Sequence, residues 1–108
     1  MAFGGLVESI SVDLVTGSQI VIVDFPVARS VQDVLIVNRT ATAQRISLWY
    51  DYDGTNAGNA ENFLVGFQIA ANRLVHLTGI WVFSSGGRIT AQAGSANTLT
   101  IHVSMADA

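Results

Sequence analysis

Hydrophobic and polar residues alternate with a period of two along much of this chain. Ile10 and Val12 are separated by serine, and near the other end Leu99, Ile101 and Val103 are separated by threonine and histidine. Successive side chains of an extended strand point to opposite faces, so this alternation places apolar residues on one face and polar residues on the other. The pattern predicts β-strands with one buried face.

The strand-like segments are short and are separated by residues typical of turns. The segments 16–18, 53–56 and 84–87 supply glycine, serine and asparagine where the chain must reverse, and Pro26 would end the strand before it. Repeated short strands of this kind predict an all-β fold, an antiparallel, jelly-roll-like β-sandwich of about eight strands. We expect one domain, with residues 1–15 as an N-terminal arm and first strand and 16–108 as the sandwich. The expected strands are Leu6–Leu14, Gln19–Phe25, Val31–Asn38, Arg45–Tyr52, Asn62–Ile69, Arg73–Leu77 extended by Ile80–Phe83, Arg88–Ala93 and Asn97–Met105.

Two segments also fit a helix. Residues 27–35 and 63–74 carry apolar side chains at steps of three and four residues. The first segment is rich in β-branched residues, which favour strands, and the second contains Gly66 and a turn-like sequence at 71–73. We therefore keep strands in both places.

Several predicted strands are apolar on both faces. Residues 20–23, 34–37 and 80–83 contain no polar position. A sandwich of two sheets has one core and covers one face of each strand, so we expect another chain to cover the second face. Trp49, which alternates with apolar neighbours, is either an exposed interface anchor or covered by a loop of its own chain. The expected interface residues are Val21, Val23, Phe25, Trp49, Trp81 and Phe83.

Composition and charge exclude several classes of protein and partner. Half of the residues are hydrophobic and 12% are charged, which excludes an intrinsically disordered chain. No apolar run approaches the roughly 18 residues of a membrane-spanning helix, and the first eight residues lack the features of a secretory signal. There is no cysteine for a disulfide or a thiolate site. A net charge of -3 leaves no basic surface, so no nucleic-acid partner is expected.

Few side chains are suited to catalysis or metal binding. His76 and His102 belong to no catalytic motif, so we expect structural or surface roles, no catalytic residue and no enzymatic activity. The acidic segment 51–56 with Glu61 places its glycine fourth and its glutamate eleventh, which does not fit an EF-hand. A hairpin turn fits this segment better, with a cation site of another kind as the alternative.

The glycines show no nucleotide-binding spacing, so no cofactor is expected. The sequon at Asn38 lacks a secretory context, so no glycosylation is expected there.

The order of the segments forms a longer pattern. A strand that ends at a proline (20–26) is followed by a strand with an Asn-Arg-Thr turn (34–40) and by an aromatic strand (45–50). A central turn (69–72), a strand that begins with Gly-Gly-Arg (86–93) and a final alternating strand (99–103) come next. In this order of segments, residues 16–108 resemble the small β-sandwich structural proteins of tailed-bacteriophage virions.

The resemblance implies an architectural role without a catalytic or cofactor site. Such proteins decorate or cement the capsid, or are accessory proteins of the neck or tail, often as trimers or larger rings. The implied location is the virion, assembled in the cytoplasm of the bacterial host, and the implied partners are further copies of the chain and virion proteins such as the major capsid protein. The alternative is a carbohydrate- or receptor-binding module of a tail or fibre, in which Trp49, Tyr50 or Tyr52 would stack on sugar rings.

Overall fold

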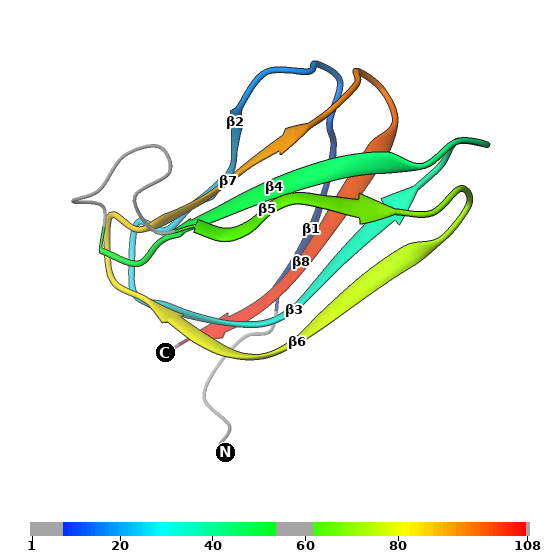
Figure 1. The fold of residues 1–108 in the computed structure, drawn as a ribbon. Coiled ribbons are helices and arrows are strands. Elements are labelled where there is room, and N and C mark those ends of the chain that lie inside the picture. Colours follow the sequence, from blue (N-terminus) through cyan, green and yellow to red (C-terminus); the bar gives the residue numbers. More distant parts are fainter. Residues whose placement is uncertain (1–7, 54–61, 108) are drawn as a thin grey trace.

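Eight β-strands make up the regular structure of the protein, in a computed structural model that describes residues 8–53 and 62–107 (Figure 1). The strands are β1 (Glu8–Asp13), β2 (Ile20–Asp24), β3 (Arg29–Asn38), β4 (Gln44–Asp51), β5 (Asn62–Ile69), β6 (Leu74–Phe83), β7 (Arg88–Ala93) and β8 (Leu99–Asp107). They form two four-stranded antiparallel sheets with the orders β1-β8-β3-β6 and β2-β7-β4-β5. The two sheets pack face to face.

The predicted all-β sandwich is confirmed. Each predicted strand overlaps one observed strand, and the two segments expected for the sixth strand are parts of the single strand β6. Residues 27–35 and 62–74 contain strands and a turn, so the helical alternatives are not adopted. Among the described residues, no helix exists that is long and apolar enough to span a membrane.

The core lies between the two sheets and is filled by the inward faces of the alternating strands. In the first sheet Val34, Ile36 and Ile101 are fully buried, and in the second sheet Ile46 and Leu48 are fully buried opposite them. In strands with one polar face, such as β8, the period of two thus predicts the buried face correctly.

Aromatic side chains fill one end of this core. The rings of Phe25 and Phe83 stack with their centroids 4.7 Å apart, and Tyr50 meets the edges of Phe83 at 5.4 Å and of Trp81 at 5.5 Å. Stacked and edge-to-face pairs of this kind add to the stabilisation from burial alone. These aromatic contacts therefore hold the end of β6 to the opposite sheet.

A buried amide fastens the other end. The Nδ2 group of Asn38 donates to the carbonyl oxygens of Thr42, Ile69 and Ala70 at 2.9, 3.0 and 3.1 Å, while its Oδ1 accepts from the backbone and hydroxyl of Thr40. These bonds connect the β3–β4 turn to the end of β5 and so tie one sheet to the other. The Asn-Arg-Thr segment is a structural element, and its buried amide is not accessible for glycosylation.

A glycine closes the turn between β6 and β7. A Cβ atom on Gly87 would lie 2.8 Å from the carbonyl oxygen of Tyr52 and 2.9 Å from that of Asp51. The backbone at Gly87 donates to the carbonyl of Ser84 and accepts from the amide of Phe25, which fixes the glycine in this place. Only glycine fits this close approach of the backbone without a shift.

Candidate interaction surfaces

The structure places two of the expected interface residues in the core of the chain itself. Phe25 and Phe83 are buried and stacked on each other. Burying these large rings removes more apolar area from water than burying the aliphatic residues beside them, so the aromatic face of β6 is turned inward. Phe25 also lines a cavity described below, and an interface role for these two residues stays a prediction.

Trp49 lies on the outer face of its sheet, yet the chain itself covers it. Its side chain is 7% exposed, and the indole nitrogen has no hydrogen-bond partner among the described residues. Of the two possibilities raised by the sequence, cover by its own chain is the one observed. Tyr50 is buried, and burial, with the neighbouring Tyr52, raises the pKa of its phenol well above the usual value. Tyr52 is half-buried, so Trp49, Tyr50 and Tyr52 do not form an exposed platform.

The other three expected interface residues keep some surface. Val21 on β2 is 44% exposed. Val23 is half-buried and lines a cavity described below, and Trp81 is half-buried with its ring against Tyr50. An interface role for these three remains a prediction.

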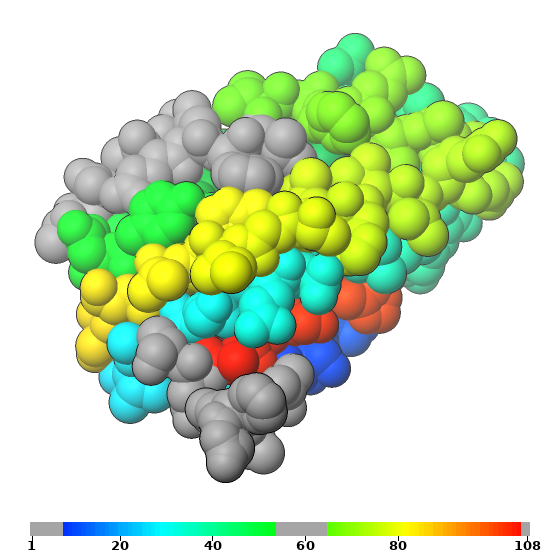
Figure 2. Space-filling model, turned by 90° about the horizontal axis from the view of Figure 1, so that it is seen from below, coloured from blue at the N-terminus to red at the C-terminus, as the bar shows by residue number. Residues whose placement is uncertain are grey.

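The largest exposed apolar side chains lie on β5 and β6, at one side of the sandwich. Figure 2 shows β6 as the yellow strand between β5 in green and β3 in cyan. We call this set the apolar edge; its members are Val65, Phe67, Leu74, Ile80 and Val82. Ile80 is 76% exposed and Val82 is 56% exposed, and β6 contains no Asp, Glu, Lys or Arg along its ten residues. The sequence pattern places Ile80 and Val82 on one face of the strand and Trp81 and Phe83 on the other, but it does not indicate which face is exposed.

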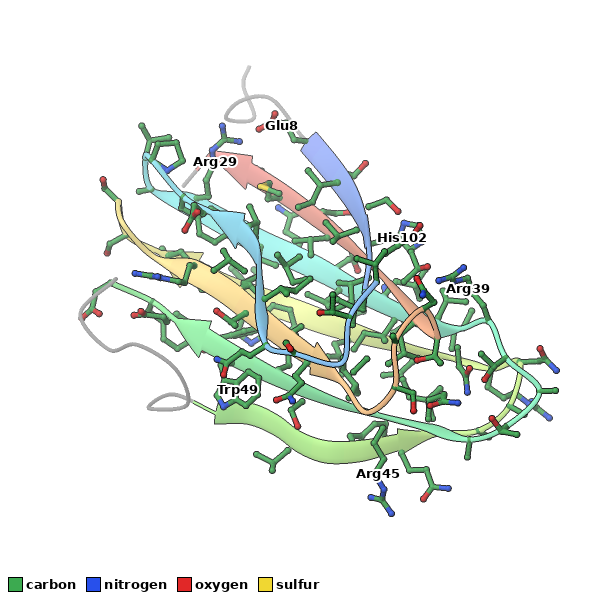
Figure 3. All side chains as sticks on the ribbon, turned by 90° about the horizontal axis from the view of Figure 1, so that it is seen from above. Glu8, Arg29, Arg39, Arg45, Trp49 and His102 are labelled. Atoms are coloured by element: carbon green, nitrogen blue, oxygen red, sulfur yellow. The ribbon has the colours of Figure 1, made fainter. Side chains whose placement is uncertain are left out.

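A cavity of about 270 Å³ lies at the opposite side of the sandwich, between β1 and β2. We call it the β1–β2 cavity. Its apolar walls come from both sheets, and Arg29 donates a hydrogen bond to Glu8 at its rim (Figure 3). The lining residues are Glu8, Ile10, Val23, Asp24, Phe25, Pro26, Arg29 and Met105.

A second depression lies on the outer face of the sheet β2-β7-β4-β5. It is lined in part by Arg45, Ser47 and Gln92, and Figure 3 shows Arg45 projecting from β4. Arg45 donates to the carbonyl of Gly66 at 2.8 Å, and the amide of Gly66 donates to Ser47 Oγ at 3.0 Å. Gly66 has a φ of 61° and lies where the β4–β5 register shifts. These polar groups therefore hold an irregularity of β5 in place.

The two histidines share the outer face of the first sheet. His76 on β6 and His102 on β8 both pair in register with Leu35 of β3, one on each side. His76 Nε2 lies 2.8 Å from Asp33 Oδ1. Within the described residues, no hydroxyl is hydrogen-bonded to either histidine ring and neither histidine lines either cavity described above.

The acidic segment is described only in part, because residues 54–61 lie outside the described residues. The carboxylate of Asp51 is buried, and its Oδ2 atom lies 3.7 Å from Arg88 Nε. Among residues 8–53 and 62–107 no three His, Cys, Asp or Glu side chains come together to hold a metal ion. The cation site considered for this segment remains untested.

Comparisons with known proteins give likenesses in structure alone. No protein-family model matches the sequence, and no curated protein matches it. A chain from the capsid structure of the Helicobacter pylori bacteriophage KHP30 superposes with a TM-score of 0.62 at 9% identity, covering 98% of this chain and 90% of the other. A chain of the cyanophage Pam1 capsid asymmetric unit has a TM-score of 0.53 at 17% identity, covering 100% and 89%.

The fold is not confined to viruses. The nucleoplasmin-like N-terminal domain of Drosophila FKBP39 superposes with a TM-score of 0.53 at 8% identity, covering 100% of this chain and 95% of the other. At these identities the likenesses establish a shared fold. The chain is a jelly-roll-like sandwich of the kind found in viral capsid proteins.

Proposed function

We propose that this chain is a non-enzymatic structural protein of a virion, which associates with further copies of itself and decorates or cements a capsid. The observation that carries the proposal is the match to a phage capsid chain over nearly the full length of both chains. Because the superposition covers almost all of both chains, the likeness extends over the whole jelly roll and is not limited to a shared part of it. A second phage capsid chain matches with similar coverage.

The surface of the molecule supports an architectural role. The apolar edge exposes aliphatic side chains on a strand without formal charge, and such surfaces are typical of contacts between proteins. A cement protein functions by burying such surfaces against neighbours that are weakly held otherwise. Individual contacts can be small, because repetition around a symmetric shell adds avidity.

The chemistry of the described residues favours a structural role over two other classes of protein, a small hydrolase that uses His76 or His102 and a carbohydrate-binding module. His76 and His102 lie on a sheet face, away from both cavities, and His76 contacts Asp33, which gives no support to a hydrolase. A carbohydrate-binding module needs exposed rings for stacking, whereas Trp49 and Tyr50 are buried. We therefore prefer the structural role.

Intact particles test the proposal. Particles of the virus that encodes this chain would be purified and analysed by mass spectrometry and by cryo-electron microscopy. We expect the chain in stoichiometric, symmetry-related copies, with density for an eight-stranded sandwich on or in the capsid, neck or tail. Purified particles that lack the chain would overturn the virion role. Binding of the isolated chain on a glycan array, together with a location on a tail fibre, would favour the alternative.

A further inference from the structure

One of the four edge strands of the sandwich has a regular, open edge. The edge strands are β1 and β6 in the first sheet and β2 and β5 in the second (Figure 1). The ladders of β2, β5 and β6 each shift in register, and such irregularities interrupt the pairing of a further strand. The ladder of β1 with β8 has no shift, and the charged residues of β1, Glu8 and Asp13, stand at its two ends. β1 is therefore the edge best suited to the addition of another strand.

The direction of the main-chain groups shows which residues of β1 are open to a partner. The amide of Leu14 donates to the carbonyl of Leu99, so the N–H and C=O groups of Asp13, one residue earlier, point away from β8. This direction alternates along an antiparallel pair, so the main-chain groups of Ser11 and Ser9 also point away from β8. Among the described residues, these groups have no hydrogen-bond partner. The three residues, all exposed, thus present an open row of donors and acceptors.

The sequence of β1 is complementary to itself in the antiparallel direction. When two copies of β1 lie antiparallel about Ser11, this serine faces its own counterpart and Ser9 faces Asp13. Ile10 then faces Val12, so polar residues meet on the outer face and apolar residues meet on the face that packs against the core. In this register each residue with open main-chain groups faces another such residue. Each of these pairs can therefore exchange two hydrogen bonds.

The charged groups of β1 restrict which strand can occupy its edge. Like charges that face each other across a sheet destabilise it, so the occupant must not place a carboxylate opposite Asp13. Another copy of β1 places the Ser9 hydroxyl there, which can donate a hydrogen bond to a carboxylate. Glu8 falls opposite Leu14, outside the paired segment, and is already paired with Arg29. A second β1 therefore meets the requirements of alternation, hydrogen bonding and charge together.

We propose that two copies of this chain associate through β1, antiparallel about a twofold axis at Ser11, so that their first sheets join into one continuous sheet. This inference rests on the self-association contained in the proposed function and names the strand that forms it. The contact is isologous, because both copies contribute the same residues, and it closes at the dimer. The apolar edge, on β5 and β6 at the other side of the sandwich, stays open to other neighbours.

Engineered cysteines test the register without background, because the chain has no cysteine. Ser11→Cys places two thiols opposite each other on the axis, with a Cα–Cα distance of about 5.5 Å that a disulfide can span. Ser9→Cys changes an exposed serine on the same face of the same strand, but its counterpart lies roughly 14 Å away along the strand. After oxidation of the full chain we expect a disulfide-linked dimer from Ser11→Cys and little from Ser9→Cys. Mixing Ser9→Cys with Asp13→Cys should restore the dimer.

The outcomes of the cysteine experiment separate this proposal from the virion role. Equal dimer yields from Ser9→Cys and Ser11→Cys would contradict the register, and no dimer in any sample would overturn the pairing. Particles that contain the Ser11→Cys chain without the cross-link would also overturn the pairing, while the virion role would stand. A cross-linked dimer of the isolated chain, together with particles that lack the chain, would overturn the virion role and leave the pairing supported.

Two lysine variants provide a matched measurement. Ser11 and Thr78 are both exposed on the outer face of the first sheet, on its two opposite edge strands. Either change to lysine makes the net charge of -3 less negative and so lessens the general repulsion between copies. At Ser11, however, two lysines would face each other, so Ser11→Lys should raise the dissociation constant about threefold or more. Thr78→Lys should leave the constant unchanged or lower it. Sedimentation equilibrium measures both constants, and tighter association of Ser11→Lys would contradict the pairing.

Discussion

The buried amide of Asn38 takes part in five hydrogen bonds. Its donors reach three carbonyl oxygens and its oxygen accepts two bonds from Thr40. Such a group is satisfied only while both turns keep their positions, because each buried partner left without a bond costs about 1–3 kcal/mol. The sequence marked the Asn-Arg-Thr segment as a turn, but its link to the end of β5 depends on a strand about 30 residues away.

Changing Asn38 to aspartate should destabilise the fold strongly. A carboxylate would present oxygen in place of the Nδ2 donor to the carbonyls of Thr42, Ile69 and Ala70. We expect the free energy of unfolding in urea to fall by about 3 kcal/mol or more. Asn72→Asp, the same chemical change at an exposed turn residue, should cost less than about 1 kcal/mol. Similar losses in the two variants would show that the amide bonds of Asn38 contribute little.

Tyr50 makes stability depend on pH in the alkaline range. Burial raises the pKa of its phenol above the usual value of 10.0, so the folded chain retains a proton that the unfolded chain releases above about pH 10. The contribution is complete below that pH, and the free energy of unfolding falls as the pH rises further. In Tyr50→Phe this fall should be shallower by up to about 1.4 kcal/mol per pH unit, measured in urea from pH 8 to 11.5. Parallel profiles for the two proteins would contradict this assignment.

At the scale of the elements, the turn between β6 and β7 depends on one residue without a side chain. Gly87→Ala would place a methyl group within 3 Å of the carbonyl oxygens of Tyr52 and Asp51. Because these are backbone atoms, the turn must shift, and we expect a loss of about 1–3 kcal/mol in thermal or urea unfolding. Gly94→Ala meets its nearest atom at 3.7 Å and should stay within about 0.5 kcal/mol of the unchanged chain. A Gly87→Ala variant as stable as the Gly94→Ala variant would refute the close-approach argument.

The strands themselves were predictable because alternation is a local property. Predicted and observed strands agree to within two residues at most boundaries, as for 88–93 and 62–69. The inward face was predictable only where the outer face is polar, as in β1 and much of β8. In β6 both faces are apolar, and the inward face is chosen by the aromatic rings of Tyr50 and Phe25, which lie elsewhere in the sequence. Within residues 80–83 the sequence predicted Trp81 and Phe83 as interface residues, and the structure exposes Ile80 and Val82 on the outer face.

At the scale of the whole molecule, pairing between distant segments determines the two surfaces discussed above. Within the described part of the chain, β4 and β5 are the sole sheet neighbours that are consecutive in sequence. The apolar edge and the β1–β2 cavity arise from strand order, which alternation along the chain does not specify. The class of fold could therefore be predicted from the sequence. The two surfaces could not, because their position depends on the order of the strands in each sheet.

Salt should strengthen self-association. Copies with a net charge of -3 repel each other, whereas the apolar edge offers uncharged side chains of β6 for self-association. Raising the salt from about 0.05 M to about 0.5 M screens the repulsion and leaves the apolar contact intact. Light scattering at constant protein concentration should therefore show an equal or larger average mass at the higher salt. Dissociation on adding salt would mean that ion pairs hold the copies together.

The pairing of Glu8 with Met105 places the beginning of β1 beside the end of β8. The turn after β5, near Asn72, lies at the far end of the sandwich, where Val37 pairs with Leu74. A short peptide linker could therefore join the first strand to the last, and new ends could be opened at the distant turn, with every strand kept in place. A circularly permuted chain built in this way would carry fused cargo at the opposite end of the sandwich.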